Sequence, residues 1–404
     1  MACSINTAQC RAKLLIYLSF VPGLAIGFIY TDLSFFLTTV RGFSALFMGL
    51  VIMVMGMTTV VTAIPLGILA DRYGRRKFLI VGNILASVTL AAFALTTNEI
   101  LLIAAAVVEG TTEAAFASAG TALLAEKAGD RSRTAAFSLS SFLGNMAWGL
   151  GGFAIPVVVV IESLGFSSTQ SHIFLYVVLA AMSLAVTPLL LRVGESRTSE
   201  KTKSLREFLP RKSRGVILRY AATSLLVAFG AGLFVPLMTQ WFKFAFGVSD
   251  AVSGPVIGIS GFLIAAATLG APNLARRLGV VRAIVLTEGL SMVFMVAVPL
   301  SPSFPIAGGV YIIRSFLMNV AGPLSTSLIM GLVDPSERGA ASGLSAAIWR
   351  FPNSLGAGIG GALMGAGFLA LPFYIASVLY IAAIALFWVL FRDAKLPEET
   401  PNPS

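Results

Sequence analysis

Twelve apolar segments of about 20 or more residues recur along the chain, and they constrain its fold more than any other feature. A helix of 20 residues is about 30 Å long, which matches the hydrocarbon core of a bilayer. We therefore expect an all-α membrane protein with twelve transmembrane helices and with both termini on the same side. The predicted spans are residues 14–37, 45–69, 78–96, 100–124, 137–161, 172–191, 216–239, 253–273, 281–301, 305–331, 340–364 and 367–391.

The composition supports a membrane location. Charged residues make up 11% of the chain and hydrophobic residues 57%, whereas a soluble domain carries about 25% charged residues. We therefore expect the lipid bilayer to be the main surrounding of the chain. The formal net charge of +10 would suggest a nucleic-acid partner in a soluble protein. Here we expect no nucleic acid, because basic residues collect in the cytoplasmic loops of membrane proteins.

The basic residues orient the predicted spans. All but four of the 28 lysines and arginines fall in the termini, in the loops on the same side of the membrane, or at the adjoining span ends. The four exceptions are Arg41, Lys243, Arg314 and Arg350. Since positive charge is retained on the cytoplasmic side, we expect a multi-pass protein of the plasma membrane with both termini in the cytoplasm.

The longest polar stretch, residues 192–214, lies between the sixth and seventh spans and predicts a cytoplasmic linker. It separates two predicted six-helix bundles, residues 1–191 and 215–404. The bundles repeat two loops at equivalent positions: residues 67–75 are similar to 272–279, and residues 130–137 are similar to 335–342. Parallel repeats of this kind are typical of transporters whose binding site lies near the midplane between two halves.

The loop between the second and third spans carries the pattern G-x-x-x-D-R-x-G-R-R, formed by Gly67, Asp71, Arg72, Gly74, Arg75 and Arg76. This pattern at this hairpin resembles the signature loop between helices 2 and 3 of the major facilitator superfamily. The resemblance covers nearly the whole chain and implies a transporter that works by alternating access. It also implies that Asp71 and Arg75 join a charge network that clamps the two halves on the cytoplasmic side. The alternative is a basic loop that only sets topology, with Asp71 capping a helix.

Two acids in the fourth span, Glu109 and Glu113, are the sharpest candidates for transport chemistry. Their spacing of four residues places both carboxylates on one face of a helix. A carboxylate within a span costs roughly 2.5–3.5 kcal/mol on insertion scales, so each needs a partner, water or a proton. We interpret the pair as a reversible proton carrier, and the resemblance places this helix beside the central cavity. The alternative is a structural pair bonded to Thr111, Thr112 or a neighbouring helix.

Arg314 in the tenth span is the expected counter-charge for these acids. Glu109 and Arg314 each lie about nine residues from the outer end of their span, or roughly 13 Å deep. We expect them to pair across the cavity as an outer gate when that side is closed. Asp32, near the outer end of the first span, either extends this acidic lining or lies at headgroup level. The predicted substrate cavity includes Tyr30, Tyr311, Asn319, Arg350 and Asn353.

The chain departs from the proton-linked antiporters of the family at two positions. Gly149 is followed by Leu150, so the Gly-Pro dipeptide of helix 5 is missing. Ala106 stands where the arginine of helix 4 belongs. The direction of transport therefore stays open between export by exchange and uptake.

Other classes of function are disfavoured. No phosphate-binding loop is present in the sequence, which argues against ATP-driven transport. The one histidine, His172, falls at the edge of a predicted loop, and we expect no metal, no cofactor and no enzyme activity. We expect a monomeric secondary transporter that exports a small solute in exchange for protons. Proton-coupled uptake and uniport are the alternatives, and a transporter-like membrane sensor is a remote one.

Overall fold

The computed structural model describes residues 8–194, 212–334 and 337–394, and all regular secondary structure in these ranges is helical. This confirms the expected all-α membrane protein. The longer helices are α1 (Ala8–Leu18), α2 (Phe20–Phe35), α3 (Ala45–Tyr73), α4 (Arg75–Leu95), α5 (Glu99–Ala115), α6 (Thr121–Ala154), α7 (Val157–Ser163), α8 (Ser168–Leu190), α9 (Arg214–Gly232), α10 (Met238–Phe246), α11 (Asp250–Leu278), α12 (Val280–Ala297), α13 (Phe304–Leu332), α14 (Arg338–Gly365) and α15 (Leu371–Phe391). Short helical segments are η1 (Phe36–Val40), η2 (Phe116–Gly120), η3 (Leu191–Val193) and η5 (Val235–Leu237).

The predicted spans correspond to helices in the structure. Among the described residues, ten helical stretches are long and apolar enough to cross a membrane. The other two predicted spans, 253–273 and 340–364, lie within α11 and α14. A shorter apolar stretch in α11 covers Asp250–Ile264. Each predicted span is therefore largely helical, with short breaks in the first, fifth and seventh spans.

Some boundaries differ from the expectation, and two of the differences are large. Residues 125–136, predicted to form a loop, continue the helical backbone of α6. The predicted seventh span is instead broken between α9 and α10, around Pro236. Proline lacks a backbone N–H and its ring clashes with the carbonyl four residues earlier, so the helix cannot run through it unchanged.

The described helices group into two compact units. Unit 1 consists of Met1–Thr202 with Met238–Phe262, and unit 2 consists of Lys203–Leu237 with Leu263–Ser404. Unit 1 thus includes α10 and the first half of α11, which follow the break at Pro236. The predicted division at the linker stays a prediction, and residues 195–211 of that linker lie outside the described ranges.

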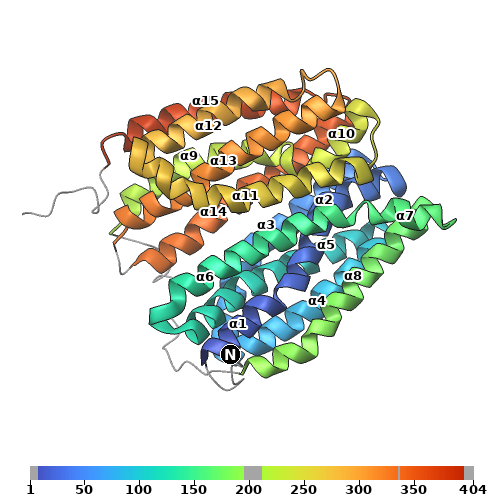
Figure 1. The fold of residues 1–404 in the computed structure, drawn as a ribbon, viewed down its shortest axis with the longest axis horizontal. Helices are drawn as coiled ribbons and strands as arrows, with labels where there is room; N and C mark the ends of the chain where they lie inside the picture. The colour runs from blue at the N-terminus through green and yellow to red at the C-terminus, as the bar shows by residue number, and fades with distance from the viewer. Residues whose placement is uncertain (1–7, 195–211, 335–336, 395–404) are drawn as a thin grey trace, which may run out of the picture. The chain divides into compact units, whose positions relative to one another are not determined.

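Unit 1 is built from helices that pack in pairs (Figure 1). α2 lies on α6, α3 on α5, and α4 on both α5 and α8. Within this unit, Gly110 of α5 lies against the backbone of α3: an added Cβ would stand 2.1 Å from the carbonyl oxygen of Met55. Only glycine permits this approach, which sets the rotation of α5 and so the directions of the side chains on either side of Gly110.

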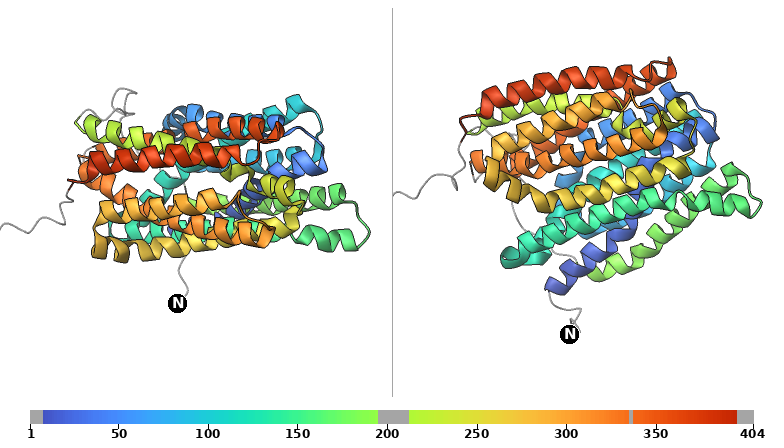
Figure 2. Two further views of the ribbon diagram at one scale, coloured as in Figure 1. Left: turned by 90° about the horizontal axis from the view of Figure 1, so that it is seen from above. Right: turned by 45° about the horizontal axis from the view of Figure 1, so that its top comes forward.

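Unit 2 has its own core. α9 packs against α14 and α15, and α12 packs against α13 and α15. Figure 2 shows these helices from two further directions, in yellow-green to red. Buried aliphatic and aromatic side chains such as Leu328, Ile284 and Phe391 fill the space between them. Burial of such side chains supports each unit separately.

The repeated loops of the two halves share a backbone turn. Gly74 ends α3 with φ 109°, and Gly279 ends α11 with φ 79°. In each turn the glycine N–H donates to the carbonyl four residues back, at 2.9 Å to Ala70 and 2.8 Å to Ala275. Because a positive φ is unfavourable for residues with a Cβ, both halves have glycine at this turn.

Candidate functional site

The two acids of the predicted fourth span lie together on α5, in unit 1. The side chain of Asn98 caps this helix by accepting hydrogen bonds from the backbone N–H groups of Ile100 and Leu101. Eleven and fifteen residues further on, Glu109 and Glu113 project from one side of the helix. Glu109 is 7% exposed, and Glu113 is partly buried.

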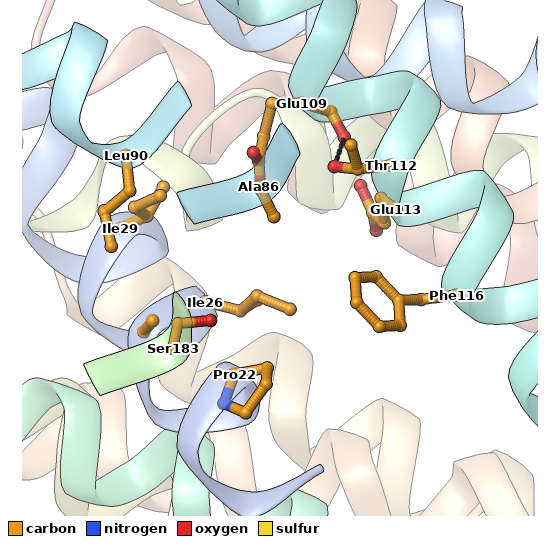
Figure 3. A pocket seen from close by; sticks show the side chains of 11 residues that line it. Pro22, Ile26, Ile29, Ala86, Leu90, Glu109, Thr112, Glu113, Phe116 and Ser183 are labelled. Carbon is orange, nitrogen blue, oxygen red and sulfur yellow. Dashed lines mark hydrogen bonds between the residues drawn. The ribbon is translucent and has the colours of Figure 1, made fainter. Parts of the chain in front are cut away.

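Glu109 is held toward α4. The hydroxyl of Thr89 donates a short hydrogen bond to its Oε2 atom. The hydroxyl of Thr112 donates to the backbone carbonyl of Glu109 at 2.8 Å, the dashed contact in Figure 3. Thr89 is itself 3% exposed. The Glu109 carboxyl group thus meets a neutral hydroxyl in a buried setting, where a negative charge is costly.

Glu113 joins three helices of unit 1. Its Oε2 atom accepts hydrogen bonds from the Tyr30 hydroxyl of α2 at 3.1 Å and from the Thr59 hydroxyl of α3 at 3.2 Å. Tyr30 was predicted to line the substrate cavity, and the structure brings it to one of the two acids. The contact with Thr59 was missed, because the sequence does not reveal which residue of a neighbouring helix faces a given position.

Both acids line a pocket inside unit 1 (Figure 3). The pocket encloses about 370 Å³ of empty space, its open mouth included. Its walls come from α2, α4, α5, η2 and α8. They are formed by Pro22, Ala25, Ile26, Ile29, Ala86, Leu90, Thr112, Phe116 and Ser183 together with the two acids. Most of these side chains are apolar, so the carboxyl groups are the ionisable groups of the pocket.

The motif loop shows contacts within unit 1. Arg75 Nη1 lies 3.5 Å from Glu126 Oε2 of α6, and Arg76 Nη1 donates to the carbonyl of Leu191 at 2.9 Å. These contacts tie the start of α4 to α6 and to η3. The clamp between the two halves stays a prediction.

Three further positions of the motif are Arg72, Gly67 and Asp71. Arg72 is exposed and lies over the ring of Tyr73, at 5.5 Å from its centroid. An added Cβ at Gly67 would meet Ser118 at 3.6 Å, an ordinary contact distance. The side chain of Asp71 lies outside the described part of the structure.

Arg314 is buried in unit 2, at 3% exposure. Its Nη2 atom donates to the Tyr380 hydroxyl at 2.9 Å, and its Cζ atom lies 4.9 Å from the centroid of the Phe234 ring. Tyr311, one turn earlier on α13, is also 3% exposed. Pairing of Arg314 with Glu109 stays a prediction.

The other residues of the predicted cavity have structural contacts in unit 2. Asn353 Nδ2 donates to the carbonyl of Ala228 at 3.2 Å and so links α14 to α9. Asn319 Nδ2 donates to the carbonyl of Ser315 on its own helix at 2.8 Å. Arg350 is partly buried on α14. Their role in substrate binding stays a prediction.

A second polar cluster forms where α2, α8 and α11 meet in unit 1. Asp32 is 0% exposed and His172 is 1% exposed. His172 Nε2 lies 2.8 Å from Asp250 Oδ2 and 3.7 Å from Asp32 Oδ1. The expectation that His172 lies at a loop edge is wrong, because α8 begins four residues earlier, at Ser168. Asp32 lies in this buried cluster and does not line the pocket of Glu109 and Glu113.

This cluster could have been noticed in the sequence. Asp32, His172 and Asp250 all fall near the same ends of three predicted spans. Their similar depth in the membrane is the feature of the sequence that indicates the cluster. The three ligand atoms lie within 4.8 Å of one another. The distance of 2.8 Å from His172 Nε2 to Asp250 Oδ2 is that of a direct hydrogen bond. Two ligands of one tetrahedral zinc ion would lie about 3.3 Å apart.

Apolar helices around a pocket with buried carboxyl groups define a class, the multi-pass membrane transporters. The family model of the Major Facilitator Superfamily matches residues 15–357. The chain belongs to the Major Facilitator Superfamily and is a secondary transporter. No curated protein sequence matches the chain significantly.

Solved structures of this superfamily are similar in fold. The nucleoside transporter NupG is 16% identical with a TM-score of 0.76, and the match covers 95% of this chain and 99% of that chain. A bacterial homologue of the human lysosomal transporter Spinster is 15% identical with a TM-score of 0.74, covering 97% and 98%. The human organic anion transporter MFSD10 is 15% identical with a TM-score of 0.63, covering 93% and 98%.

Proposed function

We propose that this transporter exports a small solute across the plasma membrane in exchange for protons, with Glu109 and Glu113 carrying the coupling proton. One observation carries the proposal. Glu109 is buried and its side chain receives a hydrogen bond from the neutral Thr89 hydroxyl. A proton is the simplest way to hold such a carboxyl group in a span, and its loss and return would couple transport to a pH gradient.

Glu113 supports the same proposal. Its bonds to Tyr30 and Thr59 reach α2 and α3, so a change in its protonation alters the contacts of three helices. Because the two acids are four residues apart on one helix face, a change of charge at one alters the electrostatic potential at the other. The pair can therefore bind the proton, and the bound proton can change how the three helices pack.

The remaining parts of the proposal follow from the sequence. Both termini are placed in the cytoplasm by the distribution of lysine and arginine. Asp71 and Arg75 clamp the two halves on that side, while Arg314 acts as a gate. The protein works as a monomer, because each half supplies its own helices to the alternating-access cycle.

Proteoliposomes test the proposal. Purified protein is reconstituted with pyranine, a pH-sensitive dye, inside the vesicles. A panel of radiolabelled nucleosides, organic cations, organic anions and sugars is then added with and without an imposed pH gradient. We expect at least one solute to move with the gradient and to change the internal pH. Glu109→Gln and Glu113→Gln should transport that solute without proton movement.

Glu99→Gln is the matched control, because Glu99 lies on the same helix and is exposed. It should behave as the wild type. A transport rate that does not depend on the pH gradient, together with full activity of Glu109→Gln and Glu113→Gln, would contradict proton coupling. Accumulation of solute in the same direction as protons would identify uptake, and movement without protons would identify uniport.

A further inference from the structure

Asp32, His172 and Asp250 form a cluster, and none of them lines the pocket of Glu109 and Glu113. The three residues come from α2, α8 and the first turn of α11, all in unit 1. Asp250 is 3% exposed, so all three side chains are buried. Neither carboxylate oxygen of Asp32 has a hydrogen-bond partner among the described residues. A buried carboxylate in this state calls for a nearby positive charge.

The contacts of the imidazole define where its hydrogens lie. His172 Nδ1 lies 2.7 Å from the backbone carbonyl of Ser168. A carbonyl only accepts, so Nδ1 carries a hydrogen. His172 Nε2 faces Asp250 and Asp32, which are acceptors when ionised. A second hydrogen on Nε2 turns two repulsive contacts into a charge-assisted hydrogen bond and an ion pair.

The other groups around the imidazole do not replace this proton. The Phe36 ring is stacked on His172, with centroids 5.4 Å apart, and Arg41 lies over the same Phe36 ring at 5.3 Å. Tyr176, on the same helix as His172, is the further titratable group beside Asp32. Among the described residues, the groups that contact the imidazole are therefore the Phe36 ring, the Ser168 carbonyl and two carboxylates.

The cluster holds a segment that follows the break in the seventh span. Residues 238–262 belong to unit 1, although the preceding helix α9 belongs to unit 2. The Thr239 hydroxyl donates to the Thr31 carbonyl at 2.7 Å and lies 2.9 Å from the Ser34 hydroxyl oxygen. These links are neutral. Of the contacts described for this segment, the one between His172 and Asp250 changes with gain or loss of a proton.

The same segment also packs closely on α6. An added Cβ at Gly152 would stand 2.9 Å from the carbonyl oxygen of Gly254 and 2.9 Å from the nitrogen of Gly258. The two backbones approach this closely because the positions are glycine. Side chains also take part, since the Phe153 and Phe262 rings stack with centroids 5.5 Å apart. The segment is therefore held on α6 by apolar contacts and on α2 and α8 by polar links.

We propose that Asp32, His172 and Asp250 form a proton-binding site whose occupancy holds residues 238–262 against α2 and α8. With the proton bound, the imidazolium stands between two carboxylates. Without it, Nε2 presents a lone pair to two negative charges, and Asp250 is repelled together with the start of α11. Protonation thus holds residues 238–262 against α2 and α8, and deprotonation releases them. The proposal rests on the alternating-access part of the proposed function and not on Glu109 and Glu113.

The chain has one histidine, so NMR can read this site directly. Full-length protein labelled with ¹⁵N-histidine and reconstituted in nanodiscs contains a single labelled ring. At neutral pH we expect hydrogens on both ring nitrogens in the wild type. Asp250→Asn should lose the hydrogen on Nε2. A neutral ring in the wild type would overturn the proposal, and so would stoichiometric Zn²⁺ binding that Asp250→Asn abolishes.

Thiol accessibility tests the consequence for the segment. Cys3 and Cys10, the two cysteines of the chain, are replaced by serine. A reporter cysteine is then placed at Gln240, which is 0% exposed on α10. Modification by a water-soluble maleimide is measured in detergent and divided by the rate of a free thiol at the same pH. We expect the corrected rate of the otherwise unchanged protein to rise with pH.

His172→Gln should raise this rate about tenfold or more and remove its pH dependence, because a charge-assisted bond is lost. Ser171→Ala is the matched control: Ser171 is equally buried and bonds to the Ser167 carbonyl of its own chain segment. It should keep the wild-type rate and pH dependence. A His172→Gln protein that retains the wild-type pH dependence would overturn the proposal.

These measurements need no substrate. If proteoliposome transport shows no proton coupling while the NMR and thiol results hold, the proposed function fails and the proton-binding site stands. If Glu109→Gln and Glu113→Gln uncouple transport while His172→Gln leaves accessibility unchanged, the site proposed here fails and the proposed function stands.

Discussion

Tyr30 of α2 donates a hydrogen bond to Glu113 of α5 at 3.1 Å. The two residues are 83 positions apart in the chain, and the bond joins the first and fourth predicted spans. Thr59 of α3 donates to the same carboxylate oxygen. The acid that is proposed to carry the coupling proton therefore sits at a junction of three helices, where its charge can influence how they pack.

Removal of the tyrosine hydroxyl should impair transport. A hydrogen bond to a charged group contributes about 1.5–3 kcal/mol, so we expect Tyr30→Phe to lower proton-driven transport about tenfold or more. The measurement is the initial rate in proteoliposomes with an imposed pH gradient. Tyr17→Phe serves as a control, because Tyr17 is 57% exposed. Equal rates for Tyr30→Phe and Tyr17→Phe would show that the bond has no part in coupling.

The close approach of α5 to α3 should make Gly110 sensitive to substitution. In Gly110→Ala the new methyl group overlaps the Met55 carbonyl, and overpacking of this kind costs about 1–3 kcal/mol. We expect a lower Tm by intrinsic fluorescence in detergent. Gly144→Ala is the comparison, since its added Cβ would have no atom within 4 Å. It should be neutral or stabilising, by up to about 1 kcal/mol. A Gly110→Ala protein as stable as Gly144→Ala would contradict the packing described for α5.

Replacement of Arg314 tests its proposed gating role. Arg314→Ala removes a buried cation that bonds Tyr380 and contacts Phe234. We expect transport to fall about tenfold or more, because loss of one partner of a buried charged hydrogen bond is strongly unfavourable. The populations of conformational states, measured by double electron–electron resonance, should shift as well. Arg392→Ala, at an exposed position, should change neither. Unchanged transport and unchanged populations in Arg314→Ala would end the gating proposal.

The motif loop should matter more for transport than for stability. Arg75 and Glu126 are 3.5 Å apart and their side chains are 15% and 24% exposed. Such a pair contributes about 1 kcal/mol or less to folding. We therefore expect Arg75→Gln to leave the Tm nearly unchanged and to slow transport. Lys77→Gln, at an exposed position in the first turn of α4, should have no effect on either. A large loss of Tm with normal transport would assign Arg75 a structural role instead.

Much of the candidate site could be located from the sequence, but its contacts could not. The depth and spacing of Glu109 and Glu113 followed from helical geometry, and both residues line one pocket of unit 1. Their hydroxyl partners on α2, α3 and α4 are set by packing between helices. The break at Pro236 was missed for a related reason: many transmembrane helices tolerate proline, and only the neighbouring contacts decide whether the helix bends or stops.

The sequence by itself determined the family, the helical spans and the glycine turns at Gly74 and Gly279. The physical reason is local: about 20 apolar residues must close their own backbone hydrogen bonds in hydrocarbon, and a positive φ requires glycine. Only the tertiary structure decided that His172 meets Asp250, 78 residues away, and that Arg314 meets Tyr380. Helix rotation and pairing arise from side-chain packing summed over many contacts, so they are not encoded in any one segment.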